Sequence, residues 1–108
     1  MDKDKLYFQH IVQAVEKIRE YTKGLTAEGF KTSTLIQDGA IRELEIIGEA
    51  ARMISENTKK AHPDIPWYEI SGMRNRLIHE YFGVDLDAVW KTITQDLDSL
   101  VEKLEKFA

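Results

Sequence analysis

The segment DLDAVWKTITQDLDSLVEKLEKF, residues 85–107, decides the fold class because its apolar side chains recur every three or four positions. That spacing is typical of an amphipathic helix, which has 3.6 residues per turn. Asp85 stands just before the pattern, where its carboxylate can accept hydrogen bonds from the free amide groups of a helix N-terminus. We therefore expect a helix capped by Asp85. Its predicted core face is Leu86, Val89, Trp90, Ile93, Leu97, Leu100, Val101, Leu104 and Phe107.

Two earlier segments have the same periodicity. The first runs from Asp4 to Leu25 and predicts a helix that ends near Gly24. The second is expected to start near Thr34 and to run for about 26 residues, until Pro63 forbids its continuation. The predicted core positions are Tyr7, Ile11, Val15, Ile18, Tyr21 and Leu25 in the first helix, and Ile36, Ala40, Leu44, Ile47, Ala51 and Ile54 in the second.

The connections between these helices are predicted from polar residues, glycine and proline. The stretch TAEGFKTS, residues 26–33, is expected to be a loop in which Thr32 or Ser33 caps the second helix. A shorter third helix is expected from Trp67 to His79, with Pro66 at its first position. With no strand-like alternation anywhere, we expect an all-α chain, an up-and-down four-helix bundle with a short third helix, forming one domain over residues 1–108.

Composition excludes several classes of protein. The 108 residues include no cysteine, which excludes a disulfide framework, a cysteine-based zinc site and a thiol nucleophile, and fits a reducing, cytoplasmic location. No apolar run approaches the ~20 residues that a membrane-spanning helix needs, so we expect a soluble protein without a membrane partner. The formal net charge of -4 argues against a broad phosphate-binding surface, so any contact with RNA must be local.

The segment MRNRLIHEY, residues 73–81, holds the densest group of potentially catalytic side chains. Arginine offers a planar fork of donors for phosphate oxygens, and His79 can give or take a proton near neutral pH. On a straight helix Asn75 and Arg76 are neighbours of His79, whereas Arg74 lies about 140° away from it. Either the helix ends or distorts near His79, or Arg74 and His79 of two copies meet across a symmetric interface. The non-catalytic alternative leaves the arginines solvated or ion-paired.

These residues resemble the signature of a known family. Arg74, four residues, His79, one residue and Tyr81 match the R-x4-H-x-Y pattern of HepT-like toxins in the HEPN superfamily of ribonucleases, and Asn75 also fits that pattern. Upstream, AIRELEIIGEAA (residues 40–51) is similar to the family's second-helix segment, and IPWYEISGMRN (residues 65–75) is similar to its lead-in to the motif.

The resemblance implies a metal-independent endoribonuclease that needs no cofactor and acts as a homodimer with one composite cleft. In that mechanism the 2′-hydroxyl of the RNA attacks the adjacent phosphate, which leaves a 2′,3′-cyclic phosphate and a free 5′-hydroxyl. His79 is expected to act as general acid or base, and Arg74 to stabilise the charge on the phosphorane. Asn75 and Arg76 are expected to support the site, although Asn75 is equally consistent with an ordinary surface amide.

Tyr81 carries a second implication of the resemblance. HepT-like toxins are paired with a minimal nucleotidyltransferase antitoxin that transfers AMP onto this tyrosine, so a type VII-like toxin–antitoxin system is implied. An anionic nucleotide two residues from His79 would block the cleft and repel RNA. The competing function is a non-catalytic HEPN binding module that partners a nucleotidyltransferase, which the acidic pI near 5.4 favours. A structural dimerisation bundle ranks last.

Two carboxylates of the second helix, Glu45 and Glu49, invite a metal interpretation. Di-metal helical bundles also need Glu-x-x-His pairs, and no Asp or Glu of this chain has a histidine three residues later. We therefore expect no metal site, and instead expect these residues to form ion pairs along the helix with Arg42 and Arg52.

Overall fold

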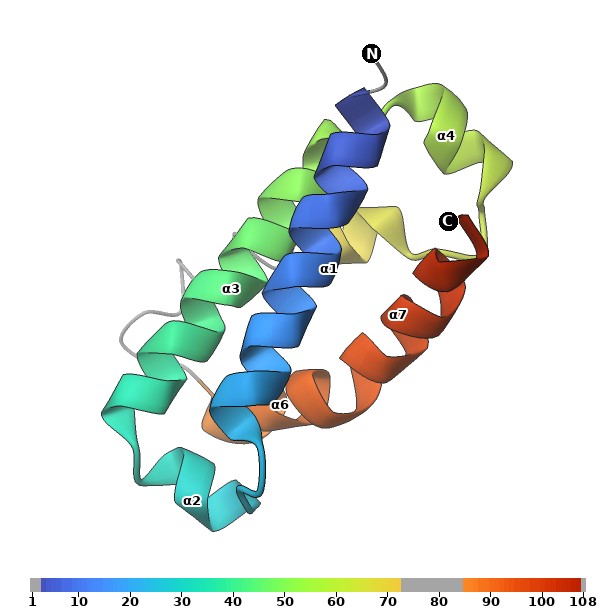
Figure 1. The fold of residues 1–108 in the computed structure, drawn as a ribbon. Helices are drawn as coiled ribbons and strands as arrows, with labels where there is room; N and C mark the ends of the chain where they lie inside the picture. Colours follow the sequence, from blue (N-terminus) through green and yellow to red (C-terminus); the bar gives the residue numbers. More distant parts are fainter. Residues whose placement is uncertain (1–2, 73–84, 108) are drawn as a thin grey trace.

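The computed structural model describes residues 3–72 and 85–107, and all regular structure within these residues is helical, which confirms the all-α prediction. Figure 1 shows two long helices side by side with shorter helices around them. In chain order the elements are α1 (Lys3–Thr22), α2 (Ala27–Lys31), α3 (Thr34–Met53), α4 (Glu56–Ala61), a helical stretch at residues 67–72, α6 (Leu86–Lys91), a π-helical turn (Thr92–Asp96), α7 (Leu97–Leu104) and a 3-10 turn (Glu105–Phe107).

Helices α1 and α3 run antiparallel and form the centre of the core (Figure 1). Tyr21 is 40% exposed, so its predicted core position was wrong. One part of its ring lies over Gly39 of α3, about 3.3 Å from where a Cβ atom would stand, and the rest faces solvent. Tyr7, Leu25 and Ile36 are half-buried. The other predicted core positions of these helices are confirmed as buried: Ile11, Val15, Ile18, Ala40, Leu44, Ile47, Ala51 and Ile54.

The stretch predicted to be a loop at residues 26–33 contains helix α2, so that prediction was wrong. Thr26 caps the helix by accepting a hydrogen bond from the Gly29 amide at 3.1 Å, and Phe30 is completely buried. A single apolar side chain among polar neighbours shows no periodicity, which is why the pattern did not indicate a helix. Ser33 caps α3 by accepting from the Ile36 amide at 3.3 Å, as predicted.

The second long helix is shorter than expected, because the chain breaks between α3 and α4. Ile54 is extended (φ -62°, ψ 140°) and its side chain is buried, while Ser55 caps α4. The Asp4 carboxylate of α1 accepts hydrogen bonds from the Ser55 amide at 2.9 Å, the Ser55 hydroxyl at 2.6 Å and the Thr58 hydroxyl at 2.5 Å. A contact between segments this far apart in the chain gives no signal in a local pattern.

Asp4 supplies a testable link between pH and stability. Burial raises its pKa, but the hydrogen bonds from Ser55 and Thr58 and the charge of Lys59 outweigh burial and hold the pKa below its usual 3.8. Because the native carboxyl binds its proton less tightly than the unfolded one, its contribution is full above about pH 4 and is lost as the pH falls through the lowered pKa. We expect Asp4→Ala to lower the free energy of unfolding by about 1 kcal/mol at pH 7.

Urea unfolding of both proteins at pH 7 and in acid measures this effect. The difference between wild type and Asp4→Ala is expected to shrink as the carboxyl becomes protonated. A difference of equal size at both pH values would show that the Asp4 charge contributes nothing.

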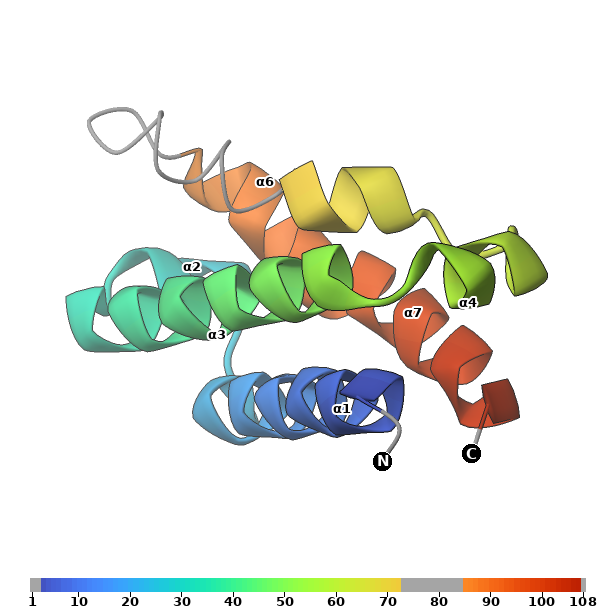
Figure 2. The same cartoon turned by 90° about the horizontal axis from the view of Figure 1, so that it is seen from above.

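The C-terminal segment follows its prediction with one local change. Asp85 caps α6 by accepting from the amides of Asp87 at 3.0 Å and Ala88 at 3.1 Å, as expected. A π-helical turn, Thr92–Asp96, then interrupts the regular winding, and Figure 2 shows α6 and α7 crossing α1 and α3 at an angle. Leu86, Trp90 and Val101 are half-buried, and the side chain of Phe107 lies outside the described part. The confirmed core positions are Val89, Ile93, Leu97, Leu100 and Leu104.

The described residues contain three long helical segments, and the predicted third helix is seen only at residues 67–72. The rest of that prediction, up to His79, lies outside the described residues. None of the helices in the described part is both long and apolar enough to cross a lipid bilayer.

Candidate functional site

The residues that the sequence singles out for chemistry, Arg74, Asn75, Arg76, His79 and Tyr81, all lie outside the described residues. The structure does describe the two helical segments that flank them in the chain, which are together called the frame below. One side of that frame is the helical stretch at residues 67–72, called the lead-in helix below, and the other side is α6.

The lead-in helix is anchored to the core on one face. Trp67 is 8% exposed, its indole N–H donates to the His62 carbonyl at 3.0 Å, and its ring centroid lies 6.2 Å from that of Phe8. Ile70 is also 8% exposed, and its amide donates to the Pro66 carbonyl at 3.0 Å, which closes the first turn. These contacts fix both the axis and the rotation of the helix as it leads toward Arg74.

Helix α6, the other side of the frame, is attached to the core by a separate set of contacts. Val89 of α6 is buried, and the ring centroid of Trp90 lies 5.3 Å from that of the buried Phe30 on α2. The Lys31 ammonium pairs with the Asp87 carboxylate, which raises the pKa of Lys31 above its usual value. The lead-in helix and α6, which precede and follow residues 73–84 in the chain, are therefore attached to the core by independent sets of side chains.

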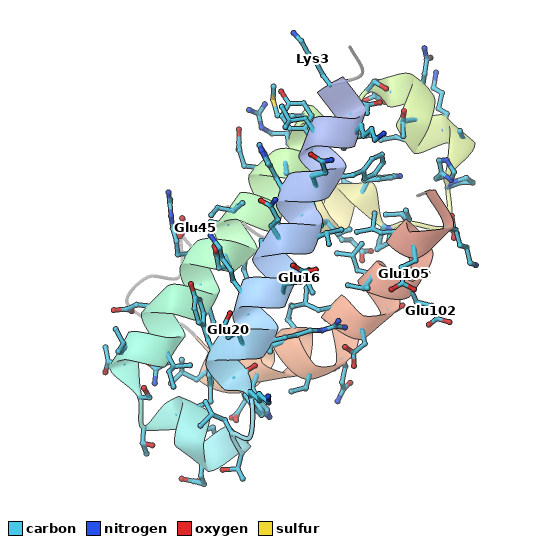
Figure 3. All side chains as sticks on the ribbon, in the orientation of Figure 1. Lys3, Glu16, Glu20, Glu45, Glu102 and Glu105 are labelled. Carbon is cyan, nitrogen blue, oxygen red and sulfur yellow. The ribbon has the colours of Figure 1, made fainter. Side chains whose placement is uncertain are left out.

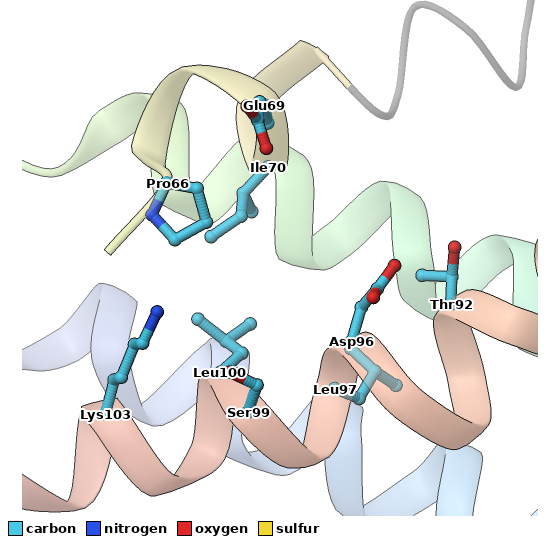
Figure 4. A pocket seen from close by; sticks show the side chains of 9 residues that line it. All are labelled: Pro66, Glu69, Ile70, Thr92, Asp96, Leu97, Ser99, Leu100 and Lys103. Atoms are coloured by element: carbon cyan, nitrogen blue, oxygen red, sulfur yellow. The ribbon is translucent and has the colours of Figure 1, made fainter. Parts of the chain in front are cut away.

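A cavity of about 220 Å³ lies between the lead-in helix and α7 (Figure 4). Figure 4 shows Ile70 and Leu100 facing one another across it, with the charged groups of Asp96 and Lys103 at its sides. Two of its three charged side chains are carboxylates, which repel phosphate, so the cavity is a poor site for an RNA backbone. It is lined by Pro66, Glu69, Ile70, Thr92, Asp96, Leu97, Ser99, Leu100 and Lys103.

The exposed face of α3 carries the ion pairs predicted for it. Arg52 donates to Glu49 at 2.7 Å, which raises the pKa of the guanidinium, and Arg42 lies 4.0 Å from Glu45. Within residues 3–72 and 85–107, no three acidic or histidine side chains are arranged to hold a metal ion. These four residues therefore have a structural explanation as surface ion pairs.

One buried charge was missed by the sequence analysis. Glu43 is only 4% exposed, and its carboxylate lies 3.6 Å from the ammonium of Lys17, whose own side chain is largely exposed. The sequence spacing could have predicted this burial. Glu43 follows Ala40 by three positions and precedes Ile47 by four, which places its carboxylate on the predicted core face. It stabilises the contact between α1 and α3 only while that ion pair holds.

Much of the described surface is unsuited to RNA. Figure 3 shows the carboxylates of Glu16 and Glu20 along α1, that of Glu102 on α7 and that of Glu105 on the 3-10 turn that follows it. Within the described part, six basic side chains already form ion pairs with carboxylates, which reduces the positive charge that they offer to phosphate. They are Lys17, Arg19, Lys31, Arg42, Arg52 and Lys59.

Comparison with known proteins adds an independent finding. A family model described as "Ribonuclease HepT-like" matches residues 11–107. A protein of Thermococcus cleftensis named "Probable ribonuclease HepT" is 46% identical over 102 residues, covering 94% of this chain and 93% of that protein. No solved structure matches the chain.

Two further relatives bear RNase names. A Methanocaldococcus jannaschii protein named "Gamma-glutamylcyclotransferase and putative RNase" is 43% identical, with 98% of this chain matching 48% of that longer protein. A "Putative RNase" of Caldanaerobacter subterraneus subsp. tengcongensis is 38% identical over 93% of this chain and 89% of its own length. The similarity covers the described frame and residues 73–84 alike.

Proposed function

The chain belongs to the HepT-like ribonuclease family, and on that premise we propose that it is an endoribonuclease that cleaves RNA without a metal ion. The observation that carries the proposal is the complete R-x4-H-x-Y pattern of Arg74, His79 and Tyr81, which lies inside the matched region between two anchored helices. The "ribonuclease" and "RNase" names of the relatives support the same activity.

The proposed reaction needs only groups that this chain and the RNA supply. A base, His79 of one copy, takes the proton of the 2′-hydroxyl as that oxygen bonds to the adjacent phosphorus. The bond from phosphorus to the 5′-oxygen breaks, and an acid, His79 of the second copy, protonates the leaving oxygen. Arg74 stabilises the negative charge that grows on the phosphorane oxygens. Asn75 and Arg76 support the site by hydrogen bonding and positive charge.

A homodimer accounts for the spacing of the motif. If the lead-in helix continues through residue 79 as the third helix of an up-and-down four-helix bundle, Arg74 and His79 of one copy diverge by about 140°. Two copies whose motif helices face one another bring the missing partner from the other subunit. In this proposal each copy contributes a single HEPN-like domain that spans residues 1–108.

The proposed physiological role is that of a cytoplasmic toxin in a type VII-like toxin–antitoxin system. Its partner would be a minimal nucleotidyltransferase antitoxin that transfers AMP to the Tyr81 hydroxyl. The added phosphate is anionic, so it repels the RNA backbone and occupies the space beside His79.

Replacing Tyr81 by phenylalanine tests this regulation. Tyr81→Phe lacks only the acceptor hydroxyl, so we expect no AMP transfer and cleavage activity within about two-fold of the wild type, since the hydroxyl takes no part in proton transfer. Intact-mass measurement after incubation with the nucleotidyltransferase and ATP reports the transfer. Tyr68→Phe, which removes an exposed hydroxyl near the motif, is the matched control and should still be modified. Modification of Tyr81→Phe at the wild-type level would contradict the assignment.

The acidic balance of the chain supports one alternative, a non-catalytic HEPN module that binds a nucleotidyltransferase. The net charge of -4 opposes the capture of RNA from solution. Incubation of the purified protein with total RNA in EDTA separates the two functions. The proposed enzyme fragments the RNA in EDTA, whereas a protein that binds the transferase but never cuts RNA would establish the alternative.

A further inference from the structure

The side of α1 that points away from α3 lies under a groove. Helix α1 packs its buried side chains against α3, and Figure 2 shows no helix of the described part beyond the other side of α1. The groove has a volume of about 850 Å³, and its further walls are Thr58 of α4, His62 and Leu104 of α7. The α1 residues that line it, together named the outer face, are Lys5, Phe8, Gln9, Val12, Gln13 and Glu16.

We propose that the outer face binds the outer face of a second copy of this chain, with the two α1 helices antiparallel across a two-fold axis. The first evidence is the placement of two charges. Lys5 and Glu16 are both exposed, and within residues 3–72 and 85–107 neither of them forms an ion pair. They lie within about 20° of the same side of α1 and about 17 Å apart along it. An antiparallel second helix therefore brings its Glu16 opposite Lys5 and its Lys5 opposite Glu16.

The uncharged residues of the outer face have the same symmetry. Phe8 and Val12 lie about 30–70° to one side of the line that joins the two charges. Gln9 and Gln13 lie by the same angles on the other side of that line. The two-fold axis that pairs position 5 with position 16 sets Phe8 beside Val12 of the second copy, and Gln9 beside its Gln13. The outer face thus pairs an apolar group with an apolar group, an amide with an amide and a cation with an anion.

Self-complementarity is the property that a two-fold contact requires, since both subunits use the same patch. The lysine and the glutamate leave the outer face neutral in a chain of net charge -4, so two acidic copies repel each other least there. The Asp4 carboxylate also borders the groove, but it accepts hydrogen bonds from Ser55. The contact covers apolar surface as well, because Val12 is 37% exposed and Phe8 is half-buried.

This contact is separate from the homodimer proposed above for RNA cleavage. It uses no residue of the motif and does not depend on ribonuclease activity. Where the symmetry axes of the two contacts differ, the assembly contains at least four chains.

Charge reversal tests the pairing. Lys5→Glu sets two glutamates against each other at both ends of the contact, and Glu16→Lys sets two lysines there. We expect each variant to raise the Kd of the contact about 10–100-fold. At a concentration where the wild type is associated, each should at least halve the mass that analytical ultracentrifugation measures.

Mixing the two single variants is the sharpest part of the test. Both ends of a mixed pair hold one glutamate and one lysine again, so we expect the mixture to associate as the wild type does. Native mass spectrometry identifies the mixed pairs by their mass. The double variant Lys5→Glu/Glu16→Lys should also regain association, and circular dichroism checks that every variant is folded.

Lys3→Glu is the matched control. It makes the same change of charge at an exposed position of α1, about 160° around the helix from Lys5, and should leave the mass unchanged (Figure 3). Net charge alone predicts instead that Glu16→Lys associates more tightly, because that variant is less acidic. Tighter association of Glu16→Lys would overturn the inference. So would single variants with the wild-type mass, a mixture that stays dissociated, or a wild type that is monomeric at every concentration tested. None of these results bears on RNA cleavage, which is measured separately.

Discussion

Replacement of Phe30 by alanine is expected to lower the free energy of unfolding by about 3–5 kcal/mol, the usual cost of deleting a fully buried phenylalanine side chain. Phe30 has no exposed surface, and its ring centroid lies 5.3 Å from the ring centroid of Trp90. It is the single buried residue of α2, so its loss also releases the helix that links α1 to α3. Urea denaturation at neutral pH measures the change.

Leu35→Ala is the matched control for this prediction. Leu35 is 84% exposed at the start of α3, and its truncation is expected to change stability by no more than about 0.5 kcal/mol. If Phe30→Ala cost no more than Leu35→Ala, the position of α2 against the core would be wrong.

Replacement of His79 by alanine is expected to reduce kcat by about 10²–10⁴-fold, the range that positioned proton transfer contributes. The reason is that alanine can neither remove the 2′-hydroxyl proton nor protonate the leaving 5′-oxygen. Cleavage of total RNA in EDTA gives the rate, and light scattering confirms that the variant has the same oligomeric mass as the wild type.

His10→Ala is the control for the histidine effect. His10 lies on α1, where its ring meets Tyr7 at 6.2 Å between centroids, and it has no role in the proposed site. It should leave kcat unchanged. A His79→Ala protein as active as His10→Ala would remove His79 from the catalytic machinery.

The large helices were predictable because their stability comes from one-sided burial, which leaves a periodic trace in the sequence. Ile11, Val15 and Ile18 are buried on α1 as their spacing predicts, and Asp85 and Ser33 cap the helices that follow them. The errors occur where a few long-range contacts outweigh local pattern. The polar stretch at residues 26–33 forms a short helix around the buried ring of Phe30. The second helix breaks where Ser55 donates hydrogen bonds to Asp4, a residue fifty-one positions earlier in the chain.

The residue types of the candidate site could be predicted from the sequence, whereas the contacts that hold its flanking helices could be predicted only in part. The R-x4-H-x-Y pattern needs no structure to be read, because side-chain types and their spacing define it. The sequence did not reveal how its frame is anchored, since the hydrogen bond from the Trp67 indole to the His62 carbonyl depends on a turn that no periodicity describes.

The central claim, a transesterification that uses the RNA's own 2′-hydroxyl, is tested most directly by the ends of the cleavage products. Wild-type protein is incubated in EDTA with an RNA oligonucleotide and with the same sequence carrying 2′-deoxyribose, and the products are analysed by mass spectrometry. The account predicts 2′,3′-cyclic phosphate and 5′-hydroxyl ends from the RNA and no cleavage of the deoxyribose substrate. Products with 5′-phosphate ends, or equal cleavage of both substrates, would contradict it.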